Sequence, residues 1–130
     1  MDIISALFAE NIDLHPAPGG STRIDLTGIM FSVAAPQPPP VQITPHLIVL
    51  VRCRPNEDGE GILEVRFTDE AGEQVARNVS PFHVEPGKFT YRLVRGELEY
   101  KDFTTIEAHC RLLPDGAATV VPLTLLPPAS

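Results

Sequence analysis

The chain has 130 residues, of which 43% are hydrophobic and 21% charged, a composition typical of a globular domain and not of a disordered chain. Its formal net charge of −7 argues against binding to nucleic acid or to an anionic membrane, because both surfaces require clustered lysines and arginines. We therefore predict a single acidic domain spanning residues 1–130.

The N-terminal segment lacks the basic region of a signal peptide, and no apolar run is long enough to cross a bilayer. We therefore expect a cytoplasmic protein of bacterial type. Residues 2–12 fit two structures, a helix that begins behind Asp2 as N-cap or an edge strand that closes a sandwich. We favour the strand, because the rest of the chain has strand periodicity. The apolar residues concerned are Ile3, Ile4, Leu7, Phe8 and Ile12.

Residues 23–33 have apolar side chains at even positions before Gly28 and at odd positions after it. This change of phase predicts a glycine bulge or bend at Gly28. The following segment, residues 35–44, contains four prolines. Proline has no N–H to donate to a central ladder, so we predict a stiff, polyproline-like crossover between sheets. Binding of this segment to an aromatic groove is the alternative.

Residues 46–54 are apolar on both faces through Val51, which predicts a central strand. Residues 63–68 and 75–79 alternate apolar and polar side chains around a glycine-containing loop, which predicts a β-hairpin. Further strands are predicted at residues 89–94, 105–112 and 120–126, and the proline pair that follows leaves residues 127–130 as a tail.

The predicted fold class is all-β. We expect an antiparallel β-sandwich of about eight strands with Greek-key connections of the immunoglobulin or C2 type and little or no helix. A small barrel is the alternative. The predicted core consists of Leu47, Val49, Val51, Leu63, Val65, Phe67, Phe89, Tyr91, Leu93, Ile106, Ala108, Cys110 and Leu123.

The sequence carries no recognisable catalytic motif. It has no C-x-x-C, no H-x-H, no G-x-S-x-G and no glycine-rich phosphate loop, so we assign no catalytic, metal-binding or cofactor-binding residue and expect no enzyme. Cys53 and Cys110 are expected to be buried and unbridged. An acidic loop at residues 56–60 invites a calcium interpretation, but its spacing is not that of an EF-hand. His109 beside Glu107 suggests an acid/base pair or, as we prefer, a solvated charge pair.

Five arginines fall on the predicted outward phase of their strands. If these strands share a sheet, the arginines and His109 would form an anion-binding or partner-binding face, since the guanidinium group captures carboxylate and phosphate. The simpler interpretation is cross-strand pairing with nearby glutamates. The residues of this candidate face are Arg52, Arg54, Arg66, Arg92, Arg111 and His109.

Several stretches together resemble an uncharacterised family of small bacterial β-sandwich proteins. The resemblance covers nearly the whole chain and implies a sandwich fold, an unassigned function and no site residues. The stretches are Leu7–Glu10, Leu26–Ile29, Pro45–Leu47, Leu63–Val75 and Pro86–Arg92.

Three functions remain open from the sequence. The first is a non-enzymatic interaction module that forms a homo-oligomer or binds another protein, with Ile3–Phe8 as the candidate pairing edge. The second is a small-molecule, glycan or anion binder, which an exposed Tyr100 and Phe103 beside an arginine would favour. The third is a metal-dependent or acid/base enzyme, which requires that two of His46, His83 and His109 converge.

Overall fold

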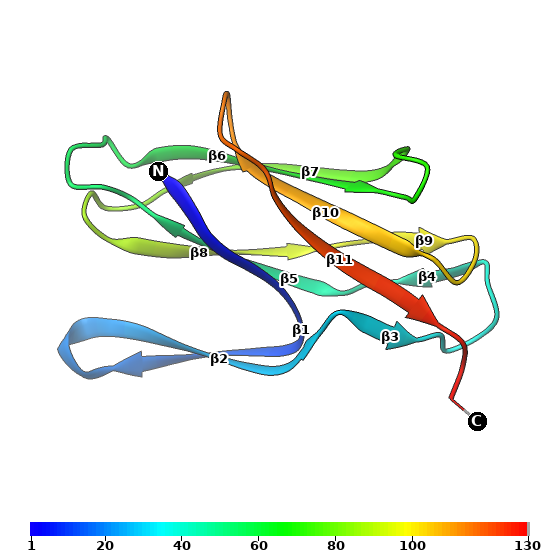
Figure 1. Cartoon of the computed structure of the whole chain (residues 1–130). Helices are drawn as coiled ribbons and strands as arrows, with labels where there is room; N and C mark the ends of the chain where they lie inside the picture. Colours follow the sequence, from blue (N-terminus) through cyan, green and yellow to red (C-terminus); the bar gives the residue numbers. More distant parts are fainter. Residues whose placement is uncertain (130) are drawn as a thin grey trace.

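The computed structural model describes residues 1–129, which form an all-β sandwich, as expected (Figure 1). Eight strands have seven or more residues, and three further strands of three residues each were not expected. The Greek-key connection stays a prediction. The elements are β1 (Asp2–Ala17), η1 (Pro18–Gly20), β2 (Ser21–Met30), β3 (Ser32–Ala34), β4 (Val41–Ile43), β5 (His46–Arg52), β6 (Glu60–Thr68), β7 (Gln74–His83), β8 (Phe89–Arg95), β9 (Leu98–Tyr100), β10 (Thr105–Leu112) and β11 (Thr119–Leu126).

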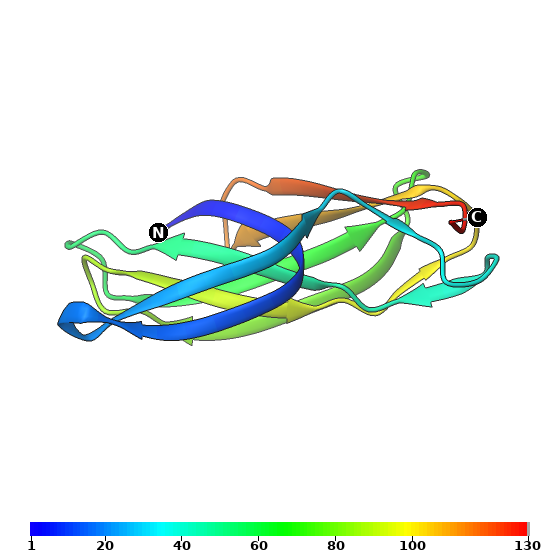
Figure 2. The same cartoon turned by 90° about the horizontal axis from the view of Figure 1, so that it is seen from below.

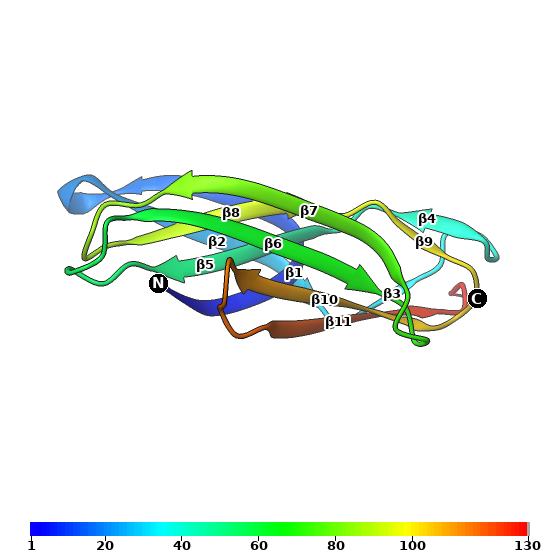
Figure 3. The same ribbon diagram turned by 90° about the horizontal axis from the view of Figure 1, so that it is seen from above.

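Two main sheets stack face to face, as Figure 3 shows for β6 and β7 above β5 and β8. Sheet A has the strand order β2-β1-β5-β8, and sheet B has the order β3-β11-β10-β6-β7. A small third sheet joins β4 to β9, so the end of the proline-rich segment 35–44 is a short strand and not only a crossover. The described strand pairs are antiparallel except β3 with β11, which is parallel. No helix in residues 1–129 has the length and apolar character of a membrane span.

Strand β1 connects the sandwich to a protruding arm. Residues 2–12 are indeed a strand, and Asp2–Ala9 pair with β5. Strand β1 also contacts β10 and β11 of sheet B. One edge of the candidate pairing segment Ile3–Phe8 is already paired with β5, and β2 pairs with β1 only from Phe8 onward. That this segment binds a partner strand stays a prediction.

The second half of β1 and most of β2 form a two-stranded hairpin, residues 11–27, which we call the hairpin arm. Gly28 has a φ of +67°, and a side chain at this position would clash with the side chain of Glu10. The register between β1 and β2 continues unbroken across it, so the predicted change of phase at Gly28 is a bend and not a bulge. The arm folds back alongside the outer face of β8 (Figure 2).

The core lies between sheets A and B, and ten of the thirteen predicted core residues are buried there. The exceptions are on β8. Val49, which faces the core, is paired with Arg92, so Thr90, Arg92 and Val94 share the inward phase. The prediction that Phe89, Tyr91 and Leu93 face the core is wrong, because alternation fixes which residues share a face but not which face is buried.

The remaining expectations concern the hairpin, the cysteines and the tail. Strands β6 and β7 form the predicted hairpin across Asp69–Glu73. Cys53 and Cys110 are buried and unbridged, as expected. Residues 127–129 contain no regular structure, and the last residue of the predicted tail 127–130 lies outside the described residues.

Candidate functional site

The structure brings together only half of the predicted arginine face. Arg66 and Arg111 lie with His109 on the outer face of sheet B, because β6 and β10 are neighbours. Arg92 faces inward at the open edge of the sandwich, with its guanidinium carbon 5.7 Å from the centre of the Phe82 ring. The prediction that Arg92 points outward is therefore wrong.

Two further arginines of that predicted face lie elsewhere. Arg54 follows β5 and donates a hydrogen bond of 2.9 Å to Asp2 at the start of β1. Arg52 lies on β5, where its register partners are Asp2 and Phe89 of sheet A. Neither arginine can join Arg66 and Arg111, because these lie on the other sheet.

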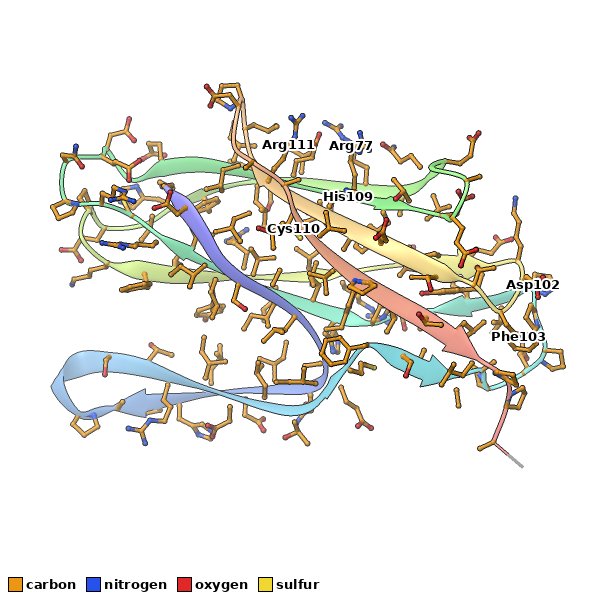
Figure 4. All side chains as sticks on the ribbon, viewed as in Figure 1. Arg77, Asp102, Phe103, His109, Cys110 and Arg111 are labelled. Atoms are coloured by element: carbon orange, nitrogen blue, oxygen red, sulfur yellow. The ribbon has the colours of Figure 1, made fainter. Side chains whose placement is uncertain are left out.

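A buried carboxylate organises the outer face of sheet B. Glu64 on β6 is buried, and both of its oxygens accept hydrogen bonds from arginines. Arg77 donates from Nε (3.0 Å) and Nη2 (2.7 Å) to Oε2, and Arg111 donates from Nε (2.7 Å) to Oε1. Figure 4 shows Arg77 and Arg111 near each other on this face. The hydrogen bonds from Arg77 and then Arg111 hold the pKa of Glu64 below its usual value of 4.5.

Arg66 completes what we call the arginine cluster, which consists of Glu64, Arg66, Arg77 and Arg111. Its direct cross-strand neighbours are Arg77 on β7 and His109 on β10. Within residues 1–129, no carboxylate oxygen lies within 4.0 Å of the Arg66 guanidinium. Like charges directly opposite each other on neighbouring strands are destabilising, so Arg66 occupies an unfavourable position.

Glu64 and Arg77 were not among the predicted site residues. The signal for Arg77 was the hairpin itself, because pairing residues 63–68 with 75–79 across a short loop places Arg77 opposite Arg66. Glu64 is one of the nearby glutamates that the simpler interpretation pairs with the arginines across strands. Its burial beneath two guanidiniums depends on the order of β7, β6 and β10 in sheet B, which the sequence does not specify.

His109 lies beside the arginine cluster but does not complete a catalytic relay. Its Nε2 is 2.9 Å from Oγ1 of Thr68 and 3.9 Å from Oε1 of Glu107. In a catalytic triad, the carboxylate accepts a hydrogen bond from Nδ1 of the histidine. The other ring nitrogen, Nε2, then stays free to take the proton of the hydroxyl group. Here both partners meet the same nitrogen, and Thr68 is buried. The arrangement does not support nucleophilic catalysis.

The other candidate groups for metal or redox chemistry are dispersed. No three His, Cys, Asp or Glu side chains in residues 1–129 are placed to hold a metal ion. In the acidic loop 56–60, Glu57 pairs with the N-terminal amine and with the backbone N–H of Arg54. Burial raises the pKa of the Cys110 thiol to about 12, so this cysteine is a poor nucleophile.

Tyr100 and Phe103 do not form the aromatic platform considered for glycans. Tyr100 is buried and donates a hydrogen bond of 2.6 Å to the backbone oxygen of Leu123. Phe103 is exposed beside Asp102 at the end of the sandwich where the chain ends (Figure 4). Only one of the two rings is therefore accessible to a ligand.

A second feature is an apolar groove of about 880 Å³ between the hairpin arm and the outer face of sheet A, which we call the outer groove. Among its lining residues, Lys88 alone is charged and none carries a carboxylate. Phe89 at its edge is 66% exposed, and Leu93 further along β8 is 50% exposed. The lining comprises Ile4, Gly19, Gly20, Ser21, Thr22, Ile24, Leu50, Gly87, Lys88, Phe89, Thr90 and Tyr91.

No protein-family model matches the chain, and no curated protein matches it.

Proposed function

We propose that the chain is a non-enzymatic interaction module that associates with a second copy of itself through the outer face of sheet A. The observation that carries this proposal is the outer groove and the exposed apolar residues of β8 beside it. Most residues on the outward phase of three neighbouring strands of this sheet are apolar. In register across β1, β5 and β8 lie Leu7, Ile48 and Leu93, followed by Ser5, Leu50 and Tyr91. Ile48 is buried, so the apolar side chains that this face exposes are mainly Ile4, Phe89 and Leu93.

Charge favours this face over the rest of the surface. A chain with a net charge of −7 repels its own copies, so association requires a surface where carboxylates are scarce and apolar area is exposed. The outer groove meets both conditions. Because both copies carry the same patch, a twofold-symmetric dimer buries both patches and leaves neither exposed for further association.

The edge of sheet A supports the same arrangement. In the described part of the chain β8 pairs with β5 only, so its outer edge offers unpaired backbone N–H and C=O groups. Antiparallel pairing of β8 with its copy would satisfy these groups and extend sheet A across the twofold axis. It would also place Leu93 of one copy beside the apolar face of the other.

The test compares two substitutions of similarly exposed apolar residues on different faces. Leu93→Glu places a carboxylate on the outer face of sheet A, whereas Val120→Glu places one on the outer face of sheet B, where Val120 is 45% exposed. We expect the wild-type chain and Val120→Glu to dimerise equally. Leu93→Glu should weaken dimerisation by roughly 100-fold, because a desolvated charge then faces an apolar partner. Sedimentation equilibrium over a wide concentration range measures the dimerisation constant of each of the three proteins.

A wild-type chain that stays monomeric at the highest concentration would overturn the proposal. Equal weakening by the two variants would also contradict it, since the effect would then come from added negative charge alone and not from the outer face of sheet A. Far-ultraviolet circular dichroism of each variant establishes that the fold is kept, which is expected because both side chains are exposed.

A further inference from the structure

We propose that the arginine cluster on the outer face of sheet B is a binding site for a dianionic phosphoryl group. This inference goes beyond self-association and concerns the opposite sheet. Its residues are Glu64 and Arg66 on β6, Arg77 on β7 and Arg111 on β10.

The charge of the cluster fits a dianion. The cluster contains three guanidiniums and one carboxylate, of which Arg77 and Arg111 contact Glu64, and this leaves two positive charges in excess on a chain that is otherwise strongly acidic. A phosphate monoester carries about two negative charges at neutral pH. Guanidinium groups bind such oxyanions through paired, charge-assisted hydrogen bonds, so the chemistry and the charge both fit a phosphoryl group.

Glu64 holds two of the guanidiniums in fixed positions. Its two oxygens engage three donor groups of Arg77 and Arg111, and each guanidinium has five N–H donors in all. The side chains of Arg77 and Arg111 are 47% and 41% exposed, so they remain accessible to a ligand. An anion that binds there meets donors whose orientation is already set, which lowers the entropy cost of binding.

Arg66 is the residue that folding alone does not explain. It is exposed, has Arg77 and His109 as cross-strand neighbours, and has no carboxylate partner in the described part of the chain. A neutral residue would remove the repulsion between Arg66 and Arg77 without loss of an ion pair within residues 1–129. Local arrangements that oppose stability are expected at functional sites, and a bound dianion would turn this repulsion into a shared attraction.

The surroundings limit the size of the anion. Glu107 lies beyond His109 on β10, and its carboxylate is 3.9 Å from the ring of that histidine. Asp69 and Glu70 follow β6 at the same end and line a hollow with Arg66, Glu107 and His109. A polyanion that crossed this end would meet several carboxylates, so the face suits a single phosphoryl group and not a nucleic acid.

The experiment is a titration followed by NMR of the arginine Nε–Hε groups at low ionic strength, with inorganic phosphate and glycerol 3-phosphate as the probes and chloride as the reference anion. We expect saturable shifts of the Arg66, Arg77 and Arg111 signals with both phosphates and none with chloride. Tighter binding of glycerol 3-phosphate would identify a monoester as the ligand, and equal binding would identify the inorganic anion. Both results support the site.

Two variants with the same loss of charge separate the site from general electrostatics. Arg66→Gln should weaken phosphate binding roughly tenfold or more, because a charge-assisted contact is lost. Arg23→Gln, on the hairpin arm, should leave it unchanged. Arg66→Gln should also be at least as stable as the wild type, because the repulsion with Arg77 is removed. The absence of saturable shifts, or equal weakening by both variants, would overturn the proposal.

Discussion

Replacement of Phe8 by alanine is expected to lower the free energy of unfolding by about 3–5 kcal/mol, because a large apolar side chain is lost and a cavity remains. Phe8 is 1% exposed and lies in the core at the point where β1 passes from β5 to β2. Its register partners are Leu47 on β5 and Met30 on β2. The substitution therefore weakens both the core and the junction with the hairpin arm.

Phe31→Ala is the matched control, since Phe31 is 64% exposed and its truncation should change stability by at most about 0.5 kcal/mol. Urea unfolding of both variants, at a concentration low enough to keep the chain monomeric, gives the two free energies. Similar losses for the two phenylalanines would contradict the placement of β1. A large change in the denaturant slope of Phe8→Ala alone would show instead that the hairpin arm unfolds separately.

Three strands with alternating apolar and polar residues show how far the sequence determines this fold. The alternation of residues 63–68 and 105–112 predicted both the strands and their buried faces, because charged side chains occupy the other phase. Residues 89–94 alternate as well, but Arg92 lies on the inward phase and three large apolar residues lie on the outward phase. The usual polarity rule then selects the wrong face. Only the pairing of β8 with β5 decides it.

The candidate site was predictable to a similar extent. The outward phase of Arg66 and Arg111 followed from alternation along single strands, and the structure places both on one face. The central role of Glu64 depends instead on three strands that meet in the order β7, β6 and β10. Sequence separation gives no guide here, since Arg111 lies 47 residues from the carboxylate that it contacts. Hairpin neighbours can be derived from turn length, whereas β6 and β10 pair through tertiary structure.

Glu64→Gln is expected to lower the free energy of unfolding at neutral pH by about 2 kcal/mol, less than for a fully buried ion pair, because both arginines are partly solvated. Glutamine keeps the shape of the side chain but replaces one acceptor oxygen by a donor, which faces a guanidinium. Glu107→Gln on the same face is the control. Its parent carboxylate is exposed and has no arginine partner within the described residues, so its loss should have little effect.

The dependence on pH identifies the origin of this loss. The arginines lower the pKa of Glu64 in the folded chain, so the carboxylate stabilises the fold fully above the unfolded-state value near 4.5. This stabilisation disappears as the pH falls through the lowered folded-state value. The difference in unfolding free energy between wild type and Glu64→Gln should therefore be largest at neutral pH and shrink as the solution is acidified. Denaturant unfolding at a series of pH values measures it.

A difference that stays constant with pH would contradict the ion-pair assignment. Any change in packing or hydrogen-bond geometry caused by the glutamine amide is the same at every pH, whereas the charge of Glu64 is lost only on acidification. The other carboxylates titrate alike in both proteins, so their contributions cancel in the difference unless they interact with Glu64. The slope of the difference therefore reports the contact of Glu64 with Arg77 and Arg111 specifically.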